Sequence, residues 1–163
     1  MDGERQVVET SIIIEHLQQS HPGPVRLIPD DPAQALEVRF MDRFFDLHVM
    51  DAAQHAVNGA LTGDAGKRSE GLALSAEKLE RAYGWLETRL AGMTWATGDT
   101  FTLADCAAAP ALFYADWVHR IGERYPVLRG YRARLLARPS VARAVDGARP
   151  YRALFPLGAP DRD

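Results

Sequence analysis

The sequence predicts an all-α protein, a bundle of five or six helices preceded by a short N-terminal strand and helix. Two observations carry this prediction. Beyond residue 32, apolar side chains recur at spacings of three and four residues, which is the period of an amphipathic helix. Prolines and capping residues stand where these periodic stretches begin, as is typical of helix starts.

The chain begins with a candidate strand and helix. Residues 6–8 form a short apolar run, and residues 9–11 precede an apolar helix that begins at Ile12 and stops near Pro22. A strand needs partners for its backbone N–H and C=O groups, so a lone strand and helix cannot form a domain. We therefore expect an upstream segment to be missing from this chain.

A long helix is predicted to follow the linker, with Asp31 as its cap and Pro32 in its first position. Three glycines should then form a loop before a second amphipathic helix, which ends at Gly92. The predicted apolar face of the first helix is Leu36, Phe40, Phe44 and Leu47, the loop glycines are Gly59, Gly63 and Gly66, and the second helix buries Leu72, Leu79, Tyr83, Leu86 and Leu90.

The third helix has the clearest start signal. Thr102 and Asp105 have the spacing of a capping box, in which each side chain bonds the backbone amide of the other residue. Pro110 should bend this helix because it frees a carbonyl in the preceding turn. The expected apolar stripe is Leu103, Ala107, Pro110, Tyr114, Trp117 and Ile121. Two shorter helices are predicted at residues 126–137 and 139–145, and the start of the tail from residue 149 should pack on the body.

Composition suits one soluble domain. The 163 residues carry a net charge of −3 and a single cysteine, Cys106, which excludes an intramolecular disulfide framework and suits a reducing cytoplasm. No apolar run approaches the roughly 20 residues of a membrane span, and none follows Met1 as in a signal peptide. We expect a cytoplasmic protein with no membrane partner.

Positive charge is concentrated late in the chain. Nine arginines and two acids lie between Arg120 and Arg152. Such a stretch can bind nucleic acid or phosphate. These arginines recur among apolar residues at helical spacing, without an aromatic stacking ladder. A solvated helix face is therefore the preferred interpretation, and no nucleic-acid partner is expected.

Four of these pieces, in this order, resemble the glutathione S-transferase family. They are residues 2–17, which are similar to the last strand and helix of the family's first domain, the Leu-Ile-Pro-Asp-Asp-Pro segment at 27–32, the capping box with its lead-in at 98–106, and the closing segments at 125–128 and 137–141. The resemblance implies a remnant of the thioredoxin-like N-terminal domain at 1–21, a linker at 22–31 and the family's C-terminal helical domain at 32–163.

The resemblance also implies site residues. In the family, an acid and a hydroxyl at this helix start hold the γ-glutamyl end of glutathione, and the matching positions are Glu9 and Thr10, where the family usually has serine for Thr10. Alternatively, Thr10 only caps its helix. A hydrophobic substrate pocket would include Phe44, Phe45 and Trp117. Alternatively, at least half of these residues belong to the core, as aromatic residues at helical spacing usually do. The family's catalytic residue lies in the missing segment, so no catalytic residue is assigned.

Two function classes stay open at this point. The first is an N-terminally truncated glutathione transferase-like protein, whose intact form would conjugate glutathione, as substrate, to small electrophiles and would form a homodimer. The alternative is a non-catalytic helical module for protein–protein contact, since an unpaired strand and an uncovered helix leave apolar surface exposed.

Two further groups of residues resemble functional sites but are better explained by structural roles. His48, Asp51 and His55 would share one helix face and could bind a transition metal, but long surface helices produce such triplets by chance, so no metal is predicted. Cys106 lies in the first turns of its helix, where a thiolate could be favoured. Its alanine neighbours favour a buried, inert thiol.

Overall fold

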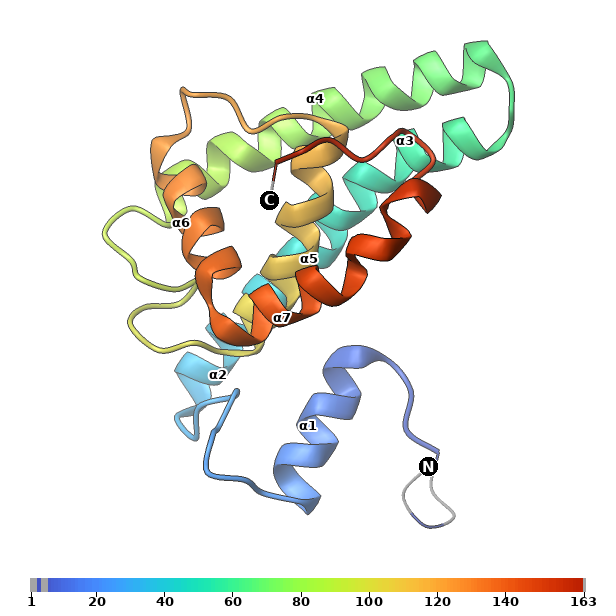
Figure 1. Cartoon of the computed structure of the whole chain (residues 1–163). Helices are drawn as coiled ribbons and strands as arrows, with labels where there is room; N and C mark the ends of the chain where they lie inside the picture. Colours follow the sequence, from blue (N-terminus) through green and yellow to red (C-terminus); the bar gives the residue numbers. More distant parts are fainter. Residues whose placement is uncertain (1–2, 4–5, 163) are drawn as a thin grey trace.

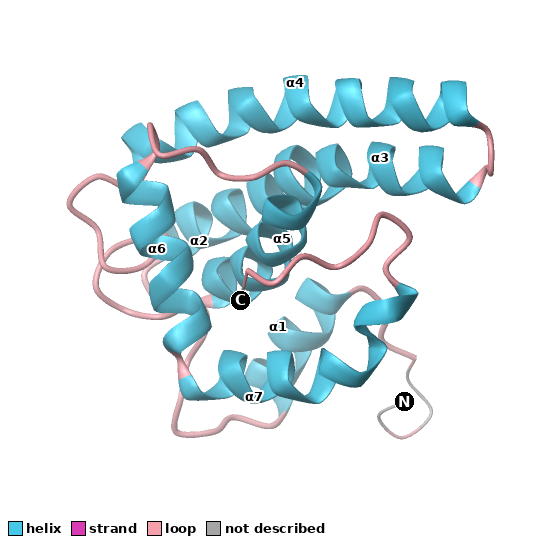
Figure 2. Cartoon of the chain, turned by 45° about the horizontal axis from the view of Figure 1, so that its top comes forward, coloured by secondary structure: helices cyan, strands magenta, loops and turns pink. Residues whose placement is uncertain are grey.

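The computed structural model describes residue 3 and residues 6–162, and its regular elements are all helices, joined by loops (Figure 1). The predicted all-α fold is confirmed. In Figure 2, α2 continues through η1 into α3, and α1 lies beside the bundle. The elements are α1 (Thr10–Ser20), α2 (Pro32–Phe44), the π-helical η1 (Phe45–Met50), α3 (Asp51–Leu61), α4 (Ala65–Arg89), α5 (Leu103–Val118), α6 (Pro126–Ala137), α7 (Pro139–Ala148) and the 3-10 helix η2 (Arg149–Leu154).

The predicted N-terminal strand is not formed. Residues 6–8 have no regular secondary structure, and the β-pairing within residues 3 and 6–162 is a single isolated bridge between Trp95 and Gly98. The reason is physical, because a strand exists only when a neighbouring strand satisfies its backbone groups.

The first long helix begins as predicted but buries a different face. Asp31 accepts a hydrogen bond from the Gln34 amide at 2.8 Å, and Pro32 follows it. The predicted face is largely in solvent, with exposed fractions of 67% for Leu36 and 47% for Phe40. The buried residues are instead Ala35, Val38, Met41, Phe45 and Val49. The helix thus has two apolar faces, and the one with smaller residues packs against α5.

The predicted glycine loop is shorter than expected, because only residues 62–64, with Gly63, separate α3 from α4. Gly59 lies within α3 and Gly66 within α4. Gly59 and Gly71 stand where the two helices touch: a Cβ at Gly59 would lie 2.5 Å from the Lys67 carbonyl oxygen, and one at Gly71 would lie 2.5 Å from that of His55. Glycine here permits backbone contact between the helices, which run side by side in Figures 1 and 2.

Helix α5 occupies the centre of the bundle (Figure 2). The predicted capping box is confirmed, with the Thr102 amide donating to Asp105 Oδ2 at 2.9 Å. Burial extends around most of the helix rather than along the predicted stripe. Two residues of that stripe, Pro110 and Tyr114, are exposed. Alanines fill five of its eleven buried positions, namely Ala104, Ala108, Ala109, Ala111 and Ala115. Their small size lets the neighbouring helices approach closely.

The closing helices follow the prediction. Helix α6 spans the expected residues, and α7 runs three residues further than predicted, to Ala148. The tail then turns through η2 and returns along α5, where Phe155 lies with its ring 5.2 Å from that of Trp117.

Candidate functional site

Helix α1 starts with an unusual backbone conformation. Glu9, the N-cap, has φ of 70°, the one positive φ of a non-glycine residue in the described chain. Strain of this kind is typical of functional positions. Within residues 3 and 6–162, no side chain caps the helix, and Thr10 is its exposed first residue rather than its cap. The positive end of a helix, with its first-turn amides, favours an anionic ligand group.

Polar contacts hold α1 to the bundle. Arg39 makes a bidentate ion pair with Glu15, at 2.7 and 2.8 Å, which lowers the pKa of that carboxyl group through the hydrogen bond. Ser11 donates to Asp42 at 2.8 Å. Burial raises the pKa of Asp42 although the Ser11 hydrogen bond acts in the opposite direction. These contacts fix the start of α1 relative to α2.

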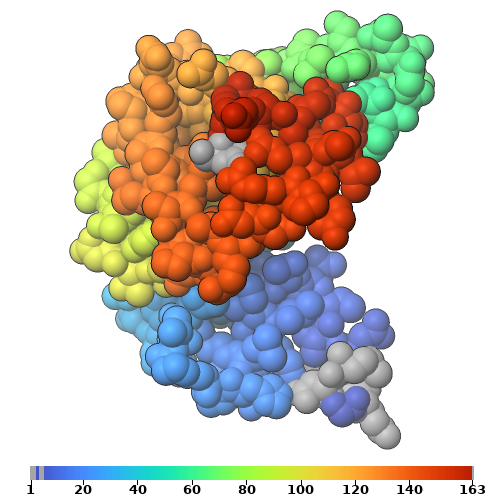
Figure 3. Space-filling model, in the orientation of Figure 1, coloured from blue at the N-terminus to red at the C-terminus, as the bar shows by residue number. Residues whose placement is uncertain are grey.

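Much of α1 nevertheless faces solvent. Its outer side exposes Ile12 and Leu17, about half of each side chain, next to Val8. In the space-filling view, the N-terminal segment stands apart from α7, with an indentation between them (Figure 3). The side of α1 turned away from the bundle is thus apolar and uncovered.

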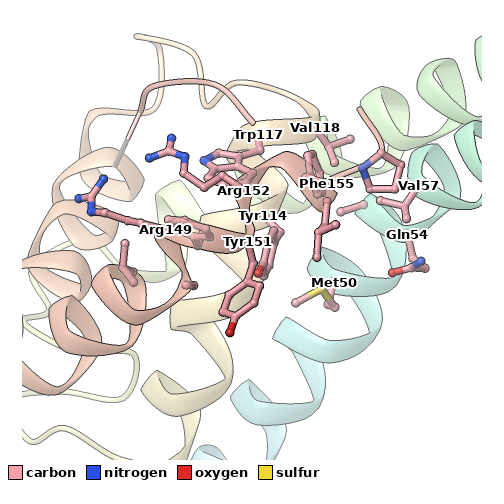
Figure 4. A pocket seen from close by; sticks show the side chains of 16 residues that line it. Met50, Gln54, Val57, Tyr114, Trp117, Val118, Arg149, Tyr151, Arg152 and Phe155 are labelled. Carbon is pink, nitrogen blue, oxygen red and sulfur yellow. The ribbon is translucent and has the colours of Figure 1, made fainter. Parts of the chain in front are cut away.

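An apolar groove runs between α3, α5 and the C-terminal segment. One pocket of this groove has a volume of about 420 Å³, within the usual size range of small-molecule sites. Figure 4 shows Met50 from η1, Tyr114 from α5 and Tyr151 from η2 converging on this space. Arg152 packs over the ring of Trp117, 5.1 Å from its centre, and closes one wall.

A second pocket of about 510 Å³ continues the groove toward the linker that follows α1. The two pockets share Phe113 and Tyr114 of α5 and two residues of α7. Leu27 of the linker and Phe101 line the far end. The groove therefore extends from the C-terminal segment to the linker that connects α1 with α2.

Cys106 lines this second pocket, but its thiol is held neutral. Burial, followed by the charge of the neighbouring Asp105, raises its pKa to about 11. A thiol with that pKa carries little nucleophilic thiolate near neutral pH. The interpretation of Cys106 as an inert residue agrees with this environment.

The structure does not bring the three predicted pocket residues together. Phe45 is fully buried and stacks on Tyr131, whereas Phe44 stacks on Trp85 at 4.1 Å in a separate hollow between α2 and α4. Only Trp117 lines the groove. Sequence reasoning missed Met50, Tyr114 as a pocket residue, Tyr151 and Phe155. For Tyr151 and Phe155, the apolar character of the tail was the sequence signal that could have placed them in a pocket.

The histidine triplet does not assemble a metal site. Nε2 of His55 lies 2.8 Å from Nζ of Lys78, a cation that would compete with a metal ion. Among residues 3 and 6–162, no three histidine, cysteine, aspartate or glutamate side chains are placed to share an ion. Over the same residues, none of the helices combines the length and apolar character needed to cross a bilayer.

Comparisons with known proteins match this architecture. Residues 51–134 match the family described as "Glutathione S-transferase, C-terminal domain". A curated relative from Vibrio cholerae, "Probable maleylacetoacetate isomerase", is 27% identical over 92% of this chain and 71% of its own length.

Solved structures agree in fold. A glutathione S-transferase from Methylobacterium radiotolerans, in complex with glutathione sulfonate, is 31% identical with a TM-score of 0.71, over 89% of this chain and 69% of that one. A glutathione S-transferase from Rhodospirillum rubrum is 22% identical, with a TM-score of 0.71. The match covers 86% of this chain and 66% of that one. The chain thus covers about two thirds of such proteins. It belongs to the glutathione S-transferase family and contains that family's C-terminal helical domain.

Proposed function

We propose that this chain is the helical part of a glutathione transferase, a cytoplasmic enzyme that joins glutathione to small apolar electrophiles. In this proposal, the groove along α5 receives the electrophile. The start of α1 receives the γ-glutamyl end of glutathione, with backbone amides and Thr10 facing its carboxylate and Glu9 pairing with its ammonium group.

The observation that carries the proposal is the position of the groove. Its second pocket ends at Leu27, in the linker that Gln18 of α1 holds through hydrogen bonds to the Leu27 and Ile28 amides at 2.8 and 3.0 Å. Hydrogen bonds thus connect α1 to the linker at which the groove ends. A ligand with a charged peptide part and an apolar part needs both features.

Calorimetric titration of glutathione into the 163-residue chain tests the α1 half of the site. We expect millimolar or tighter binding, weakened about tenfold by Thr10→Ala because one hydrogen bond to a charged group is lost. Thr62→Ala at the end of α3 serves as a control that should bind normally. A folded chain that gives no heat with glutathione would argue against this half of the proposal.

A homodimer is part of the proposal. Leu36, Phe40 and Leu47 expose about half or more of their side chains along α2 and η1, and Phe40 and Phe44 contact the ring of Trp85. Solvent-exposed apolar surface of this kind is typical of interfaces. A second copy of the chain would cover it.

Sedimentation velocity tests the dimer. The wild-type chain should sediment as a dimer, and Phe40→Glu as a monomer, because a charge would be buried in the interface. Leu61→Glu alters a similarly exposed residue near the α3–α4 turn and should leave the dimer intact. A monomeric wild type, or a dimer unaffected by Phe40→Glu, would contradict this part of the proposal.

Experiments can also distinguish two alternative functions. The likeness to the Vibrio cholerae relative favours isomerisation of maleylacetoacetate with glutathione as a variant of the same site. The uncovered apolar face of α1 favours the non-catalytic interaction module. A chain that binds protein partners through α1, but neither glutathione nor apolar ligands, would be such a module.

A further inference from the structure

Four arginines surround a small pocket that shares no residue with the groove. The pocket has a volume of about 300 Å³ and is lined by Arg120, Arg129, Arg132 and Arg162. Asp116 is the one acid that lines it in the described chain. The side chains come from three separate parts of the sequence: the end of α5, one face of α6 and the tail.

Asp116 anchors two of the four guanidinium groups. The carboxylate is nearly fully buried, and its Oδ2 lies 3.3 Å from Nε of Arg162 and 3.6 Å from a terminal nitrogen of Arg132. Arg162 also donates to the Asp116 carbonyl oxygen at 2.6 Å. The other carboxylate oxygen, Oδ1, accepts a hydrogen bond from the Ile121 amide at 2.8 Å. The carboxylate therefore holds both cations at the pocket but neutralises only one charge.

The other two arginines, Arg120 and Arg129, are exposed. Within residues 3 and 6–162, neither of their side chains makes a hydrogen bond or an ion pair. Arg129 is three residues from Arg132 on α6, so the two guanidinium groups share a helix face and line the pocket together. The lining carries four positive charges and one negative charge, in a chain whose net charge is −3.

We propose that this pocket binds a phosphate group, either free or as a small phosphomonoester. Guanidinium groups match the oxygens of phosphate through paired N–H donors, and a doubly charged oxyanion offsets most of the excess positive charge. A pocket of this size fits one phosphate group with a small substituent rather than a polymer. The two anchored arginines are held in place before binding, which limits the entropy cost of ordering them.

NMR titration of the ¹⁵N-labelled full chain tests the proposal. Inorganic phosphate and phenyl phosphate are added in separate arms at constant ionic strength, with chloride as the reference anion. Saturable shifts of the Arg120 and Arg129 side-chain Nε–H signals and of the Ile121 amide are expected. Tighter binding of phenyl phosphate would identify an ester site, and equal or tighter binding of inorganic phosphate would identify a free phosphate site.

A charge-matched control distinguishes a specific phosphate site from general electrostatic attraction. The double variant Arg120→Gln/Arg129→Gln should weaken phosphate binding at least about tenfold, since two charge-assisted contacts are lost. Arg68→Gln/Arg143→Gln removes the same charge at exposed positions outside the pocket and should bind as the wild type does. Linear shifts without saturation, or equal weakening in both double variants, would overturn the proposal.

Discussion

Asp105 connects three parts of the chain through one buried carboxylate. Besides the Thr102 amide, it accepts the Ala96 amide at 2.8 Å and the hydroxyl of Tyr131 at 2.7 Å. Burial, together with the Asp105 charge, raises the pKa of Tyr131 well above its usual value, so the phenol stays a donor. The loop before α5 and the middle of α6 are thus fixed to the start of the central helix.

Replacing Asp105 should therefore cost far more than the loss of a helix cap. Asp105→Ala leaves four buried donors without this acceptor, because the Thr102 hydroxyl also donates to the carboxylate, and we expect a loss of about 3–5 kcal/mol in the free energy of unfolding. Urea denaturation measures this loss. Asp99→Ala removes an exposed aspartate with one hydrogen bond to Thr94, and should cost less than about 1 kcal/mol. Equal losses for the two variants would contradict the assigned role.

Individual residues could be predicted where the signal is local in sequence. The capping box was readable because Thr102 and Asp105 are three residues apart, whereas the bond from Tyr131 joins residues 26 apart in the chain. Phe44 and Phe45 illustrate the opposite case. Neighbouring residues on a helix point in directions about 100° apart, so the two rings could not be expected to face one pocket, and neither lines the groove.

At the scale of elements, the α3–α4 hairpin depends on backbone contact. Gly71→Ala would place a Cβ 2.5 Å from a carbonyl oxygen of α3, so the helices must separate. We expect a loss of about 1–3 kcal/mol in the free energy of unfolding. Gly84→Ala lies in the same helix with no atom within 4 Å of the new Cβ, and should stabilise by about 0.5–1 kcal/mol. Thermal or urea unfolding compares the two, and a neutral Gly71→Ala would contradict the close approach.

Glu80 joins α4 to the segment between α5 and α6. Burial alone would raise its pKa, but hydrogen bonds from Tyr125, His119 and Arg124 outweigh this effect and lower the pKa to about 2. The distances are 2.6 Å to the Tyr125 hydroxyl and 2.7 Å to His119 Nε2.

This lowered pKa predicts acid sensitivity. The unfolded chain protonates Glu80 near pH 4.5, whereas the folded chain keeps it ionised to about pH 2. Its contribution to stability is therefore complete above pH 5 and is lost as the pH falls from about 4.5 to 2. Glu80→Gln should lower stability at pH 7 and flatten this acid limb, which urea unfolding at several pH values measures. A variant with an unchanged acid limb would contradict the prediction.

Helix positions were largely predictable, whereas helix faces were not. Asp31–Pro32, Pro126 and Pro139 mark the starts of α2, α6 and α7 in the sequence. The burial of α2 could not be read from its pattern because its larger apolar side chains lie on the outer face. The widened turn η1 follows from packing and leaves no local sequence signal.

At the scale of the whole molecule, the proposed glutathione and electrophile site, the proposed dimer contact and the arginine pocket occupy separate regions. The groove ends at Leu27, in the linker that α1 contacts through Gln18. The exposed face of α2 and α4 provides the proposed dimer contact, and the arginine pocket shares no residue with the groove. The sequence indicated the family and the helical domain through short motifs in order. The groove depends on side chains from Met50 to Phe155, and it exists only once the tail folds back along α5.

The central claim is that the start of α1 and the groove act as one site. Calorimetric titration of glutathione and S-hexylglutathione into the same chain tests it most directly. Because the hexyl group would bury about six methylene-sized units in the groove, S-hexylglutathione should bind at least about tenfold more tightly than glutathione, and Tyr114→Ala should reduce this gain. Equal affinities for the two ligands, or a gain that Tyr114→Ala leaves intact, would contradict the account.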